Sequence, residues 1–126
     1  MHLPKRPLSP HIHIYRMPLT ALLSILHRAT GAVLFIGLLL MIVMLVSIAN
    51  GIHAWQTVQP FLSSGLGKLL VFGFSFSLYY HCCNGIRHLF WDIGKGLSFS
   101  TAHQSAWVVL ASAIILTLTT WVIALL

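Results

Sequence analysis

Three long apolar runs limit what this chain can fold into: residues 29–49, 66–91 and 106–126. As a helix, each run is long enough to cross a hydrocarbon core of about 30 Å, at a rise of about 1.5 Å per residue. Helices also satisfy their own backbone hydrogen bonds in lipid. The sequence therefore predicts an all-α membrane protein with three transmembrane helices, over about 22–49, 66–91 and 106–126.

The composition excludes most soluble functions. The chain has 126 residues, of which 58% are hydrophobic and 6% are charged, so lipid must solvate most of its surface. A buried soluble helix is a weak alternative for the middle run, because the chain has no soluble part to cover it. The connections are too short for a nucleotide-binding or hydrolase domain. The net charge of +6 does not indicate nucleic acid, because the basic residues are scattered over the ends of the predicted helices.

The basic residues lie mainly on one side of the predicted membrane. Four precede the first span and two follow the second, whereas the 50–68 connection has one: Lys5, Arg6, Arg16 and Arg28, then Arg87 and Lys95, against Lys68. The positive-inside rule then places the N-terminus in the cytoplasm and the C-terminus outside. No secretory signal or transit peptide is visible. This favours a multi-pass protein of the bacterial inner (cytoplasmic) membrane, with the mitochondrial inner membrane as the alternative.

The first 18 residues precede the predicted transmembrane domain, residues 19–126. Four of the five prolines lie in this segment, so it cannot form one helix. We expect it to be a cytoplasmic or interfacial segment along the inner membrane surface. Two interpretations remain open: a plain linker, or a contact with lipid headgroups or a docked partner through Ile12, Ile14 and Tyr15.

A histidine within the second apolar run is the first candidate for chemistry. Ionisable groups at membrane depth are costly, so His81 is a functional candidate by default. At about 100° per residue, a stripe on one helix face contains His81, Gly85, His88 and Asp92. An imidazole, a position without a side chain and a second imidazole would suit a haem: an iron ligand, room for the ring and a donor for its propionates. The alternative is a histidine hydrogen-bonded to a neighbouring helix.

A second axial ligand is missing from this chain. The first and third helices offer neither His nor Met at the depth of His81, so a six-coordinate iron would need a ligand from another chain. The adjacent Cys82 and Cys83 provide no C-x-x-C-H attachment. Any such haem would therefore be b-type.

The start of the first helix contains a second candidate site. Thr20, Ser24 and Arg28 share one face, with His27 next to Arg28. Arg28 at the end of a span commonly reaches toward lipid headgroups. The alternative is that hydroxyl and guanidinium bind quinone carbonyls while His27 or Arg28 meets a haem propionate.

Two stretches of the sequence resemble the signatures of a known family, the cytochrome b556 subunits of succinate dehydrogenase in respiratory complex II. The first signature is represented by Arg6-Pro7-Leu8-Ser9-Pro10-His11 and Ser24-Ile25-Leu26-His27-Arg28-Ala29-Thr30-Gly31. The second is His81-Cys82-Cys83-Asn84-Gly85-Ile86-Arg87-His88-Leu89-Phe90-Trp91-Asp92-Ile93-Gly94. The outer connection and the third run add only hydrophobicity and length to this resemblance.

The resemblance implies a role for each motif residue. His81 would be an axial ligand of haem b, with the other ligand from a second small membrane anchor subunit. Ser24 and Arg28 would line the ubiquinone site beside the iron–sulfur subunit, and His27, Arg28 and His88 would lie near the haem propionates. Asp92 would serve as a helix-end or subunit contact, or in proton delivery. Thr20 departs mildly from some relatives, which have another hydroxyl residue there.

The resemblance also implies a division of labour. A flavoprotein subunit would oxidise succinate and an iron–sulfur subunit would carry the electrons, so this chain would be a non-catalytic, electron-transfer and quinone-binding subunit in the tricarboxylic acid cycle and respiratory chain. Its three helices would form half of a haem-binding bundle shared with the second anchor subunit. Rival hypotheses are a fumarate reductase anchor, a small multidrug-type transporter and a structural anchor without a cofactor.

Overall fold

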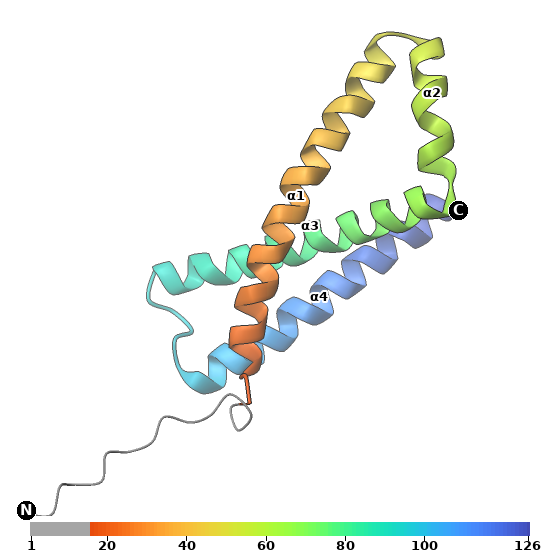
Figure 1. Cartoon of the computed structure of the whole chain (residues 1–126). Coiled ribbons are helices and arrows are strands. Elements are labelled where there is room, and N and C mark those ends of the chain that lie inside the picture. Colours follow the sequence, from red (N-terminus) through yellow and green to blue (C-terminus); the bar gives the residue numbers. More distant parts are fainter. Residues whose placement is uncertain (1–15) are drawn as a thin grey trace, which may run out of the picture.

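The computed structural model of the chain describes residues 16–126, all of its regular structure being helical. The Arg6–His11 motif and most of the predicted interfacial segment lie outside the described residues. Figure 1 shows four helices in chain order: α1 (Leu19–Ala49), α2 (Ile52–Ser63), α3 (Gly65–Asp92) and α4 (Phe99–Leu125).

Three of these helices coincide with the apolar runs. By length and composition, α1, α3 and α4 are each able to cross a membrane, which confirms the prediction of an all-α membrane protein. α1 begins directly after Pro18, whose ring is compatible with the start of a helix but not with its interior. α4 begins seven residues before the expected span, since Ser98 caps its first turn by accepting a hydrogen bond from the Thr101 N–H.

The outer connection differs from the simple loop that the sequence suggested, because it contains α2. Gly51, with a φ of 93°, makes the sharp break after α1 that a residue with a side chain would rarely allow. Within α2, Ala54, Val58 and Leu62 are half-buried at four-residue spacing, the pattern of a helix that packs on one side. The Ser47 hydroxyl of α1 donates to the Ala54 carbonyl at 2.8 Å. α2 is thereby fixed against α1.

The long helices pack unevenly along their lengths. α3 and α4 form an antiparallel hairpin, and the first half of α1 crosses this hairpin while its second half diverges toward α2 (Figure 1). A small apolar core lies where the three meet, and it consists of Leu23, Tyr80, Ala106, Val109 and Ala113. The alanines of α4 allow close approach of the backbones. The crossing of α1 over α3 therefore brings both signature segments into contact.

Candidate functional site

Three histidines from the two signatures form a cluster at this crossing. The His27 ring of α1 stacks on the His81 ring of α3, with centroids 3.9 Å apart and an interplanar angle of 13°. The His88 ring lies 5.3 Å from His27, and its other neighbour is the edge of Trp91. The stripe predicted on α3 thus faces α1 at His81 and His88.

His81 is held by α1 through one ring nitrogen. Its Nδ1 lies 3.3 Å from the Thr30 hydroxyl oxygen and 3.2 Å from the His27 carbonyl oxygen. The carbonyl can only accept. The Thr30 hydroxyl lies 2.9 Å from the carbonyls of Leu26 and His27, so its proton goes to the backbone and its lone pairs are left to accept. Both neighbours therefore favour a proton on Nδ1 and a lone pair on Nε2 of His81.

The space around His81 is tight on one side and open on the other. A Cβ at Gly31 would lie 3.2 Å from Cε1 of His81, so a glycine allows α1 to approach the ring closely. A Cβ at Gly85, one turn after His81, would meet nothing within 4 Å. Within residues 16–126, Nε2 of His81 makes no hydrogen bond and is not a fully buried atom. The coordinating edge of the imidazole is therefore free.

The other predicted site residues are less enclosed. Ser24 is half-buried and Arg28 is exposed, and neither side chain hydrogen-bonds to another of the described residues. Asp92 is also exposed, without an ion pair in the part of the chain that the structure covers. α1 places Ser24 and Arg28 one turn apart in its first half.

One residue that we interpreted only as a basic helix end, Arg87, proves to be 6% exposed. Its guanidinium donates to Ser105 Oγ at 2.9 Å, to Asn84 Oδ1 at 3.3 Å and to the Ala102 carbonyl at 2.7 Å. The Trp91 ring covers it at 4.2 Å. Arg87 therefore fastens α3 to α4.

Sequence spacing contains a signal that would have identified this network. Tyr80, Asn84, Arg87 and Trp91 follow one another at intervals of three or four residues, so they occupy one face of α3. A polar stripe at these positions within an apolar run indicates helix contacts. Thr30 was overlooked as a partner of His81 although it lies in the first signature, because nothing in a sequence shows which residues of two helices meet.

Comparison with known proteins identifies the family. Residues 2–120 match the family described as the succinate dehydrogenase/fumarate reductase transmembrane subunit. The chain belongs to this family. This family membership confirms the resemblance found in the two signatures.

Relatives of this transmembrane subunit family occur in bacteria and mitochondria. The chain is 39% identical to the succinate dehydrogenase cytochrome b556 subunit of Rickettsia felis, with 94% of this chain and 92% of that protein covered. The succinate dehydrogenase cytochrome b556 subunit of Paracoccus denitrificans is 37% identical, with 94% of this chain and 91% of that protein covered. The mitochondrial succinate dehydrogenase cytochrome b560 subunit of Bos taurus is 42% identical, with 87% of this chain and 66% of that protein covered. The chain is accordingly a membrane subunit of an oxidoreductase complex and not its catalytic subunit.

Proposed function

We propose that this chain is the haem b-binding anchor of a succinate:ubiquinone oxidoreductase, complex II. The observation that carries this proposal is His81, which α1 holds through Nδ1 while Nε2 stays free beside Gly85. The relatives' names, as cytochrome b subunits of succinate dehydrogenase, support it. We place the protein in the bacterial inner membrane with its N-terminus in the cytoplasm, because the basic residues favour that orientation.

The residues around His81 fit a haem group. His81 would hold the iron through Nε2, and the open surface at Gly85 leaves room for a flat ring. Bound haem b supplies a one-electron redox centre. The stacked His27 ring cannot be the opposite ligand, because it meets the face of His81 and not its nitrogen edge. The second ligand therefore comes from a second small membrane anchor subunit in this proposal.

The polar groups next to His81 would serve the propionates of the haem. His27 and His88 both lie beside His81, and Arg28 follows His27 directly on α1. Imidazole and guanidinium N–H groups make charge-assisted hydrogen bonds to carboxylates. We assign these three residues to the propionate end of the haem.

The hydrogen bond that Nδ1 of His81 donates to the Thr30 hydroxyl should tune this ligand. Changing Thr30 to valine keeps the side-chain volume but removes one of the two acceptors at Nδ1 of His81. Outer hydrogen bonds raise ligand basicity and fix the ring, so we expect a haem with an altered midpoint potential and a shifted low-spin electron paramagnetic resonance signal. A Thr30→Ser variant, which keeps the hydroxyl, is the matched control. A parent-like potential and signal in Thr30→Val would rule out this role.

Ser24 and Arg28 would bind ubiquinone next to the iron–sulfur subunit. One turn apart on α1, a hydroxyl and a guanidinium can donate to a quinone carbonyl oxygen and stabilise the negative charge that develops on it during reduction. The electrons would come from succinate through the flavoprotein and iron–sulfur subunits. In this proposal the chain binds and orients the haem and the ubiquinone, and it anchors the complex in the membrane.

The function is tested on the complex purified through a tag on this chain. We expect flavin, iron–sulfur and second anchor subunits to co-purify, a b-type haem spectrum, and ubiquinone reduction driven by succinate. Ser24→Ala should lower kcat/KM for ubiquinone by about fivefold to tenfold, which is the usual effect of one hydrogen bond.

Ser75→Ala is the matched control for this substitution, because the Ser75 hydroxyl donates to the carbonyl of Val71 in its own helix. Reduction of a water-soluble artificial acceptor by succinate should stay unchanged in both variants, since that reaction bypasses the quinone. A complex without succinate-driven ubiquinone reduction would contradict the proposed function. An unchanged kcat/KM in Ser24→Ala would contradict only the assignment of the quinone site.

A further inference from the structure

The positive charge of Arg87 has no carboxylate partner within residues 16–126. The whole chain contains a single acidic residue, Asp92, which is exposed and makes no ion pair in this described range. Arg87 itself is 6% exposed. A buried charge is costly unless it is compensated, so an anion from outside this chain would stabilise the site.

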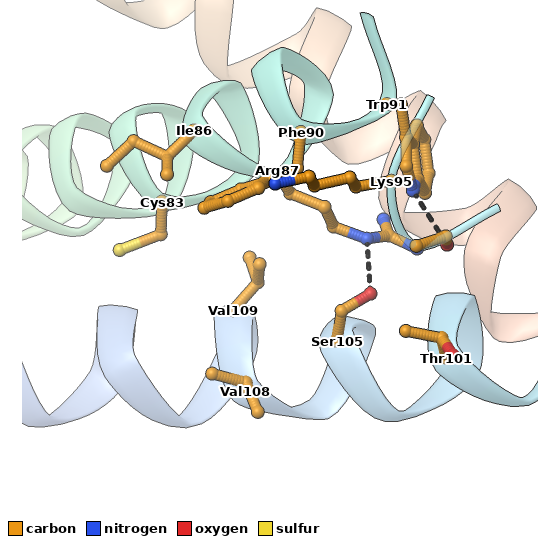
Figure 2. A pocket seen from close by; sticks show the side chains of 11 residues that line it. Cys83, Ile86, Arg87, Phe90, Trp91, Lys95, Thr101, Ser105, Val108 and Val109 are labelled. Carbon is orange, nitrogen blue, oxygen red and sulfur yellow. Dashed lines mark hydrogen bonds between the residues drawn. The ribbon is translucent and has the colours of Figure 1, made fainter. Parts of the chain in front are cut away.

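A groove lies beside this guanidinium, between the end of α3 and the start of α4. Its volume is about 300 Å³. Its polar lining residues lie near the turn between the helices, and the rest of its wall is apolar (Figure 2). Arg87, Lys95, Thr101 and Ser105 belong to the polar end, and the apolar end includes Cys83, Ile86, Val108 and Val109.

Arg87 is fixed in place and still has donors to offer. A guanidinium carries five N–H groups, and the bonds to Ser105, Asn84 and Ala102 use three of them. Two N–H groups remain. Because the network and the Trp91 ring already hold the side chain, little side-chain freedom is lost when an anion binds.

We propose that this groove binds an anionic membrane phospholipid, with its phosphate at Arg87 and Lys95 and an acyl chain against the apolar walls. The groove opens at a turn between two membrane-spanning helices, which is the level of the headgroups. Basic pockets between transmembrane helices suit anionic headgroups. Two cations that make no ion pair within residues 16–126 select a lipid with net negative charge over a zwitterionic one. The lining of this groove includes none of the residues proposed to bind the haem or the quinone.

The test uses the purified complex, delipidated in detergent and incubated with equal phosphatidylglycerol and phosphatidylcholine, and native mass spectrometry counts the lipids retained. We expect the parent to prefer phosphatidylglycerol by on the order of tenfold, the size of a strong charge-assisted hydrogen bond. Lys95→Gln should abolish most of this preference. Val108→Trp should do the same by filling the groove while leaving both cations in place.

Two control variants match these changes. Lys68→Gln removes the same charge at the other end of α3, and Val122→Trp adds the same ring at an exposed position near the end of α4. Both should keep the parent's preference. Equal retention of the two lipids by the parent, or an equal loss in Lys68→Gln, would overturn the proposal. Loss in Lys95→Gln without loss in Val108→Trp would show that the preference does not depend on an acyl chain in the groove, and would overturn the proposal as well.

Discussion

Substitution of His81 by alanine should remove the α band of the b-type haem from the purified complex almost completely. The Nδ1 of His81 is engaged with Thr30 and the His27 carbonyl, which leaves its Nε2 free beside the open surface at Gly85. The His27 ring could not replace this nitrogen, because it stacks on the face of the His81 ring. The reduced-minus-oxidised visible spectrum measures the loss.

Assembly must be checked in the same preparation, because dissociation of the complex would also remove the band. The matched control is His103→Ala, which removes an exposed imidazole from the start of α4 and should leave the band unchanged. A full α band in an assembled His81→Ala complex would place the haem elsewhere. A parent complex without any b-type band would leave a haem-free anchor as the better account.

Substitution of Gly67 by alanine should strongly destabilise the chain. A Cβ at this position would collide with the Phe61 carbonyl oxygen and lie 2.8 Å from the Leu62 Cα. Both are backbone atoms of α2, which no side-chain rotation can move away. We expect a cost of about 3 kcal/mol or more, at the upper end for overpacking, seen as a lower Tm and a poor yield of assembled complex.

The control for this substitution lies on the same helix. A Cβ at Gly73 would meet nothing within 4 Å, and alanine is the better helix former by about 1 kcal/mol. Gly73→Ala should therefore be neutral or slightly stabilising. If the Tm of Gly67→Ala equals that of Gly73→Ala, the close contact between α2 and α3 does not exist in the complex.

The features that could be predicted from the sequence depend on single helices. Apolar runs determine where helices cross lipid, and a rotation of about 100° per residue places His81 and His88 on one face. α2 was missed because its residues pack on only one side and are too few to mark a span. The bond from His81 to Thr30 could not be predicted, because it depends on where α1 crosses α3.

Arg87 illustrates a different limit. An arginine near the end of an apolar run has the same sequence pattern whether it reaches the headgroups or lies between two helices. Its burial depends on Ser105 and Ala102, which α4 supplies from the far side of the turn. Ser24 and Arg28 differ from Arg87, because their proposed partners belong to other molecules. Neither side chain hydrogen-bonds to another residue within 16–126.

Polar side chains make up a large part of the buried residues of this chain, and this affects how such sequences diverge. The buried polar residues are Thr30, Ser47, Ser77, Asn84, Arg87 and Thr117, whereas many large aliphatic side chains face outward. Leucine, isoleucine and valine on the outer surface can replace one another at little cost in lipid, except where a neighbouring subunit covers them. Some of these polar groups join two helices, as Ser47 does with Ala54 and Arg87 with Ser105 and Ala102, and their loss would break these links. Mutations should therefore accumulate on the outside of the bundle. The sequence identity between two such chains can become low while the contacts between their helices stay the same.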